Sequence, residues 1–211
     1  MINKTISKKE IKWIKLLNEF DKTIDNLGRT IDKQIKDTVI VLNLLGFRTM
    51  GSCEGHLSNN RLRFPYIYCE IKGEPKYEYR GERSVRRKLI KKYNIKNWNV
   101  VYSNDEIWND YKKQVIEGLE KSEEWKKWEK KNEPLGEKIK KLINEYNKVK
   151  ISSKNNKIQV ERVYPGYRIV TLMVENEENY SNKEKKKLIK LSQKEFKSFT
   201  EFLKDKYFNS K

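Results

Sequence analysis

Both ends of the chain carry a capping box, a motif that marks the start of a helix. In this motif the side chains of a serine and of a glutamate three residues later satisfy backbone N–H groups that the first helical turn leaves free. The motif occurs at Ser7–Glu10 and at Ser181–Glu184, and apolar residues follow both at helical spacing. We therefore expect a helix at each end of the chain, and both helices must pack against the structure formed by the residues between them.

The middle of the chain alternates between helical and extended patterns. Apolar residues at helical spacing predict helices over 30–45, 83–93, 105–134 and 135–149. Alternating and β-branched residues predict strands over 47–52 and 66–72, and a hairpin of 158–164 with 167–174. The last of these strands is apolar on both faces, which is typical of a central strand. The sequence therefore predicts an α+β fold, with helices packed on one mixed or antiparallel sheet.

The length and the cysteine content limit the number of domains and the kinds of metal site that the chain can form. A chain of 211 residues has room for one ordinary domain, and we expect a single domain over 1–211 with a helical elaboration at about 105–149. There is no signal-peptide pattern and no apolar run of the roughly 20 residues that a membrane span needs, so we expect a cytoplasmic protein without a membrane partner. Cys53 and Cys69 are not spaced as a metal-binding pair, and no metal site is predicted.

The chain has a formal net charge of +18, which is typical of proteins that bind nucleic acid. Because the sequence contains no alanine and is rich in lysine, asparagine and isoleucine, we attribute much of its lysine to an AT-rich gene. Arginine is more informative, since its planar group suits phosphate better than a point charge does. Six of the ten arginines fall between residues 61 and 87, namely Arg61, Arg63, Arg80, Arg83, Arg86 and Arg87. They indicate either a phosphate or nucleotide site or a solvated face paired with nearby glutamates.

The segment Gly51–His56 (Gly-Ser-Cys-Glu-Gly-His) contains the only histidine of the chain. If the preceding strand continues through it, Ser52, Glu54 and His56 share one face and Cys53 lies on the other. A carboxylate beside an imidazole can act as a general acid and base near neutral pH. We therefore take Glu54, His56 and Ser52 as the candidate catalytic residues. Cys53 is a weaker candidate for a nucleophile.

Two plainer interpretations of this segment stay open. It can be a polar strand end with a solvated histidine and a buried cysteine, because short motifs are easily matched by chance. It can also bind a metal through Cys53, Glu54 and His56, although adjacent residues rarely converge on one ion without a turn.

Six further residues are candidates for ligand binding. Arg168 lies on the strand that is apolar on both faces, where an arginine needs an anionic partner unless the strand edge is exposed. Glu195 falls within the apolar stripe of the last helix, so it lies either at the edge of the stripe or faces inward towards the site. The predicted ligand-binding residues are Arg48, Arg61, Arg63, Tyr68, Arg168 and Glu195.

The stretch 11–57 resembles the N-terminal part of the tRNA wybutosine-synthesising methyltransferases, the third enzyme family of that pathway. Ser52, Cys53 and Gly55 match the family signature Ser-Ser-Cys-Ser-Gly-Arg, whereas Gly51, Glu54 and His56 replace its serine, serine and arginine. The resemblance covers about a quarter of the chain, and the family's later Ser-His and Phe-Glu-Pro segments have no counterpart. It implies a related α+β core, a nucleotide or RNA ligand and, on this ground alone, S-adenosylmethionine as a cofactor.

A closer likeness is to uncharacterised bacterial and phage proteins that carry Ser-Cys-Glu-Gly-His after a helix ending in Leu-Asn-x-x-Gly. Those proteins also share a terminal helix resembling 195–203 of this chain. The likeness spans both ends of the sequence and links the motif to Glu195.

Together these observations predict a nucleotide- or RNA-directed protein that carries out group transfer or hydrolysis at the Ser-Cys-Glu-Gly-His segment. The alternative is a noncatalytic module that captures a phosphorylated small molecule, as a phage or mobile-element protein does when it acts against host defence. A basic structural protein is the third interpretation. Whether the chain is an enzyme is left open.

Overall fold

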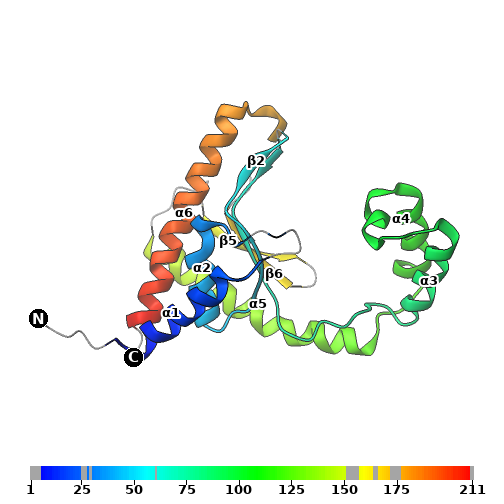
Figure 1. Ribbon diagram of the computed structural model, residues 1–211, viewed down its shortest axis with the longest axis horizontal. Helices are drawn as coiled ribbons and strands as arrows, with labels where there is room; N and C mark the ends of the chain where they lie inside the picture. Colours follow the sequence, from blue (N-terminus) through cyan, green and yellow to red (C-terminus); the bar gives the residue numbers. More distant parts are fainter. Residues whose placement is uncertain are drawn as a thin grey trace, which may run out of the picture. The chain divides into compact units, whose positions relative to one another are not determined.

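The computed structural model describes residues 6–24, 28, 30–59, 61–150, 157–163, 166–171 and 177–209 (Figure 1). The chain divides into two compact units, Met1–Ile71 with Pro134–Lys211, and Lys72–Glu133. We call the first the sheet unit and the second the helical unit. The sequence predicted one domain with a helical elaboration at about 105–149, whereas the helical unit begins at Lys72 and ends at Glu133.

The sheet unit contains a four-stranded antiparallel sheet, which confirms the predicted α+β class. Its strands, in spatial order, are β1 (Thr49–Cys53), β4 (Tyr66–Cys69), β6 (Gly166–Thr171) and β5 (Ile158–Val163). β6 lies between two neighbours and is buried at five of its six residues, as its apolar character predicted. The predicted hairpin leaves residues 165 and 166 for its turn; Pro165 lies outside the described residues, and Gly166 already belongs to β6.

Helices pack on the sheet (Figure 1). They are α2 (Lys33–Leu44), the later part of α5 (Glu123–Val149) and α6 (Asn182–Asn209), and α1 (Lys8–Asp21) packs on α2 and α6. Both capping boxes form: the Glu10 N–H donates to Ser7 Oγ at 3.2 Å, and the Ser181 N–H donates to a Glu184 carboxylate oxygen at 2.8 Å. The core of this unit includes Ile67, Ile169, Ile139, Phe199 and Leu203.

A second, two-stranded sheet was missed by the sequence analysis. β2 (His56–Ser58) and β3 (Arg61–Arg63) pair antiparallel, with His56 opposite Arg63. This hairpin packs against α6 (Figure 1). Three-residue strands are too short to produce a readable alternation of apolar and polar residues. The hairpin is separated from β1 by Gly55, whose φ of 86° suits glycine and few other residues.

The helical unit is built from α3 (Glu82–Tyr93), the 3-10 helix η1 (Trp98–Ser103), α4 (Asp105–Tyr111), the π-helical turn η2 (Lys112–Ile116) and the first part of α5. Its centre is the fully buried carboxylate of Glu82. This carboxylate accepts hydrogen bonds from the backbone N–H of Tyr79 at 3.0 Å, from the Tyr111 hydroxyl at 2.8 Å and from Arg86 Nε at 2.7 Å. Bonds to Glu82 favour its charged form and outweigh the cost of burial, so its pKa is lowered.

The predicted helix over 105–134 was wrong in two respects. The chain turns at 117–119, and Ser122 Oγ starts a new helix by accepting from the backbone N–H of Trp125 at 3.2 Å. α5 then continues through Pro134 instead of ending there. A proline removes one intrahelical hydrogen bond but does not by itself end a helix when packing holds both sides. Leu135 and Trp128 are both buried on either side of it.

Within the described ranges, none of the helices combines the length and the apolar character that a membrane span requires.

The backbone of β6 at Gly166 lies close to that of β4, and this close packing of the two strands can be tested by substitution. A Cβ at this position would lie 2.4 Å from the Cys69 carbonyl oxygen. We expect Gly166→Ala to lower the free energy of unfolding by about 1–3 kcal/mol, as overpacking does. Gly51→Ala is the matched control, because no heavy atom lies within 4 Å of its added methyl group, and it should cause no loss. Urea unfolding followed by circular dichroism measures both, and equal stability of the two variants would contradict the packing described.

Candidate functional site

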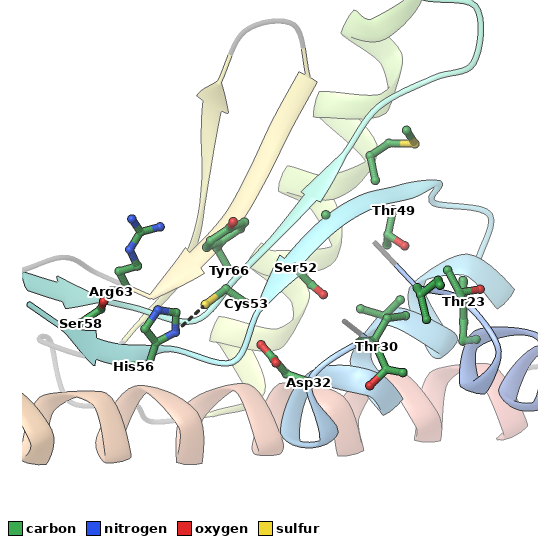
Figure 2. A pocket seen from close by; sticks show the side chains of 16 residues that line it. Thr23, Thr30, Asp32, Thr49, Ser52, Cys53, His56, Ser58, Arg63 and Tyr66 are labelled. Carbon is green, nitrogen blue, oxygen red and sulfur yellow. Dashed lines mark hydrogen bonds between the residues drawn. The ribbon is translucent and has the colours of Figure 1, made fainter. Parts of the chain in front are cut away.

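The sheet unit contains a cleft of about 860 Å³ (Figure 2). Its walls come from the end of α1 and the segment after it, the segment before α2, and strands β1 to β4. The volume is within the range of small-molecule sites. The polar lining residues are Thr23, Thr30, Asp32, Thr49, Ser52, Cys53, His56, Ser58, Arg63 and Tyr66.

The two ends of the cleft differ in chemistry. Figure 2 shows His56, Ser58 and Arg63 together at one end, and Thr23, Thr30 and Thr49 at the other. Ile24, Ile31 and Met50, which also line the cleft, directly follow these threonines in sequence, and Phe20 lies three residues before Thr23. One end therefore offers a positive charge and polar groups, and the other offers hydroxyl groups beside an apolar surface.

Cys53 and His56 are in contact, which corrects the sequence prediction that they lie on opposite faces of one strand. Cys53 Sγ lies 3.4 Å from His56 Nδ1 (Figure 2). The period of two fails because β1 ends at Cys53 and the chain turns at Gly55 before β2 begins at His56. A thiol beside an imidazole is an arrangement found in enzymes with a cysteine nucleophile.

Burial raises the pKa of the Cys53 thiol. The Gly55 N–H donates to Sγ at 3.4 Å and opposes this shift, whereas the nearby carboxylate of Asp32 adds to it. The thiol therefore keeps its proton at neutral pH, and its S–H group can donate to His56 Nδ1. His56 itself is exposed and lines the cleft.

Glu54 does not pair with His56 as the sequence suggested. Its carboxylate accepts from the backbone N–H of Gln34 at 3.2 Å, at the start of α2. In return Asp32, the N-cap residue of α2, accepts from the backbone N–H of Glu54 at 3.1 Å. Both carboxylates lie where the helix dipole favours negative charge. Asp32 lines the cleft where Glu54 was expected. The helix predicted over 30–45 included Asp32, whereas α2 begins at Lys33, so the N-cap position of Asp32 was missed.

The turn that brings Cys53 to His56 is also held from α6. Gln193 Nε2 donates to the Glu54 carbonyl at 3.1 Å and to the Gly55 carbonyl at 3.2 Å. A Cβ on Gly55 would lie 2.7 Å from Pro65 Cδ, so the turn is closely packed as well as hydrogen-bonded. Its conformation therefore depends on a residue about 140 positions along the chain.

Of the other predicted residues, Ser52 and Arg63 line the cleft. Arg61 is exposed on the same hairpin but is not part of the lining. Arg48 donates to the Ile71 carbonyl at 3.3 Å and lies 3.5 Å from the Glu70 carboxylate. The Tyr68 hydroxyl donates to the same carboxylate at 3.1 Å. Arg48 and Tyr68 therefore have partners within the fold.

Arg168 and Glu195 also have their charged partners within the chain. Arg168 Nη2 donates to Glu161 on the neighbouring strand at 2.8 Å. Glu195 is buried and accepts from the Tyr146 hydroxyl at 2.6 Å and from Lys150 Nζ at 2.9 Å. Neither residue lines the cleft.

The arginines that cluster in the sequence separate in the structure. Arg80, Arg83, Arg86 and Arg87 belong to the helical unit, while Arg61 and Arg63 belong to the hairpin of the sheet unit. Within the described part of the chain, Arg63 is the one arginine that lines the cleft.

Across the residues that the structure describes, no group of three or more histidine, cysteine, aspartate or glutamate side chains is arranged to hold a metal ion. No protein-family model, curated protein or solved structure matches the chain.

The raised pKa of Cys53 predicts its reactivity. We expect iodoacetamide to label Cys53 of the native protein slowly at neutral pH, and the increase in rate with pH should occur at higher pH than for an ordinary cysteine. Peptide mass spectrometry assigns the label, and the urea-unfolded protein is the control, in which both cysteines should react at ordinary rates. Because the folded thiol has the higher pKa, its contribution to stability should be lost as the pH rises through the titration range of the folded thiol. Rapid labelling of native Cys53 at pH 7 would contradict the described environment.

Proposed function

We propose that the cleft binds a nucleotide, free or as part of an RNA strand. The observation that carries this proposal is the position of Arg63 at the polar end of a cleft whose other end is apolar and lined by hydroxyl groups. A nucleotide has the same division, with an anionic phosphate at one end and a flat base with a hydroxyl-bearing sugar at the other.

The polar end suits a phosphate group. Arg63 is exposed and forms no ion pair with any carboxylate among the described residues. A guanidinium group can donate two parallel hydrogen bonds to phosphate oxygens. Ser58 can add a hydroxyl donor, and His56 can add a ring N–H. These three residues come from paired strands of one hairpin, so the pairing fixes their spacing.

The opposite end suits a nucleoside. Thr23, Thr30 and Thr49 present hydroxyl groups that can bond to sugar or base edges. Phe20 and Met50 contribute apolar surface for a base. The resemblance of Ser52, Cys53 and Gly55 to the signature of an RNA-modifying family supports the same ligand class, and with it a related core.

Catalysis by Cys53 and His56 is a second candidate function, favoured by the 3.4 Å separation of Sγ and Nδ1. In group transfer or hydrolysis the thiol proton would pass to His56 Nδ1 while the sulfur attacks an electrophilic atom of the ligand. The leaving group would then take the proton from His56. In a second step water, or an acceptor hydroxyl in group transfer, would attack the group bound to Cys53 and break its bond to sulfur, while its proton passes through His56 back to Sγ. Cys53 and Cys69 are both free thiols, which fits a reducing compartment such as the cytoplasm.

Binding is tested with two arginines of the same strand. Isothermal titration calorimetry with ribonucleoside mono- and triphosphates should show wild-type binding. Arg63→Ala should weaken it by about 10- to 100-fold, because a charged hydrogen bond contributes about 1.5–3 kcal/mol. Arg61→Ala is the matched control, since Arg61 lies on β3 outside the cleft lining, and it should change the affinity little. Equal effects of the two substitutions would refute the proposed phosphate position.

Turnover distinguishes an enzyme from a capture module. Nucleotides and RNA are incubated with the protein, and products are measured by liquid chromatography and mass spectrometry. If the pair is catalytic, Cys53→Ser and His56→Ala should each lower turnover by at least about 100-fold. Nucleotide binding should persist in Cys53→Ser and should be weakened but not abolished in His56→Ala, which loses one phosphate donor. Tight binding by the wild-type protein without any turnover would support the capture module instead.

A further inference from the structure

The first half of α6 presents an exposed face made of lysine. Between residues 183 and 197 the helix has seven lysines and two glutamates. Lys185 and Glu195 are buried, and the other lysines are exposed. We call the exposed set the lysine face. It consists of Lys183, Lys186, Lys187, Lys190, Lys194 and Lys197.

Helical geometry places these lysines on one side of α6. Lys183, Lys187, Lys190, Lys194 and Lys197 follow at intervals of four, three, four and three residues, which keeps them within one narrow stripe. The buried residues of the same stretch, Ile189, Ser192 and Phe196, occupy the opposite side. From the first to the last lysine the stripe extends about 21 Å, at 1.5 Å per residue.

The lysine face is not neutralised by acidic residues. None of its six members forms an ion pair with a carboxylate in the part of the chain that the structure describes. In the second half of α6 the situation differs. Lys204 pairs with Asp37 at 2.7 Å, and Lys206 pairs with Glu145. Within α6, the unpaired positive charge is thus concentrated in the first half of the helix.

Part of the lysine face lies beside Gln193, the α6 residue that holds the turn at Gly55. Gln193 bonds to the carbonyls of Glu54 and Gly55, between Cys53 and His56. Lys190 and Lys197 lie three residues before and four residues after Gln193, so helical spacing puts them next to it. The hairpin with Arg61 and Arg63 packs against the same helix. The lysines next to Gln193 therefore lie close to the turn that borders the cleft.

We propose that the lysine face binds the sugar–phosphate backbone of a single-stranded RNA, one nucleotide of which occupies the cleft. This inference rests on the proposed function and specifies its ligand. A single strand is required because a base within a duplex cannot enter a cleft without being flipped out. The threonine hydroxyls of the cleft can bond to a ribose 2′-hydroxyl, which DNA lacks.

A membrane surface suits this helix less well. A membrane-bound amphipathic helix inserts an apolar face beside its basic residues. The apolar face of α6 is instead buried in the core through Phe196, Phe199 and Leu203.

The test uses two variants with the same loss of charge. The first replaces Lys187, Lys190, Lys194 and Lys197 by glutamine. The control replaces four exposed lysines of α5 that are interspersed with glutamates, namely Lys127, Lys130, Lys131 and Lys138. Fluorescence anisotropy measures the binding of a labelled single-stranded RNA of about 16 nucleotides at several salt concentrations.

We expect the α6 variant to bind this RNA at least about tenfold more weakly than the control at low salt. The slope of log K against log salt concentration should fall by up to about 3, since each phosphate contact on a single strand contributes about 0.7. Equal losses in the two variants, or no RNA binding by the wild-type protein, would overturn the inference. Equal or tighter binding of single-stranded DNA or double-stranded RNA would also overturn it.

Titration of both variants with a mononucleotide separates this inference from the proposed function. If mononucleotide binding depends on Arg63 but RNA binding is unchanged by replacing the α6 lysines, the proposed nucleotide site in the cleft is supported and the lysine face is excluded as an RNA-binding surface. If RNA binding depends on the lysines but no mononucleotide binds, the lysine face stands as a binding surface and the cleft proposal fails.

Discussion

The left-handed turn at Gly55 is the constraint on which the candidate site depends. It ends β1, starts the β2–β3 hairpin and places Cys53 Sγ 3.4 Å from His56 Nδ1. The turn is held from two sides, by the hydrogen bonds from Gln193 and by the exchange between Asp32 and Glu54 at the start of α2. Because α6 and α2 supply these contacts, the geometry of the thiol and imidazole depends on the packing of the whole sheet unit.

Several charged residues that look functional in the sequence stabilise the fold instead. A buried carboxylate needs hydrogen-bond donors, and Glu195 obtains them from Tyr146 and Lys150. Glu82 obtains them from Tyr79, Tyr111 and Arg86. A group whose bonding capacity is met inside the fold has little left for a ligand. Arg63, which has no such partner among the described residues, is for the same reason the stronger candidate for a binding residue.

The positive charge of the protein is distributed by structure as well as by composition. The sequence concentrates arginine between residues 61 and 87, but the fold assigns these arginines to two units. The lysines of α6 are brought together by helical periodicity on the side away from the core. The combination of Arg63 in the cleft and lysines beside the turn is consistent with one polyanionic ligand that extends beyond the cleft.

Local sequence determined the types of elements, the α+β class and the position of the Ser-Cys-Glu-Gly-His segment at the end of a strand. Capping boxes and apolar periodicity act over a few neighbouring residues, so they can be read without the fold. The tertiary structure alone decided that Cys53 faces His56, that Asp32 takes the place of Glu54 in the cleft, and that Glu161 pairs with Arg168. The physical reason is that a side chain's partner is set by contacts between distant segments, and a period of two holds only as far as the strand continues.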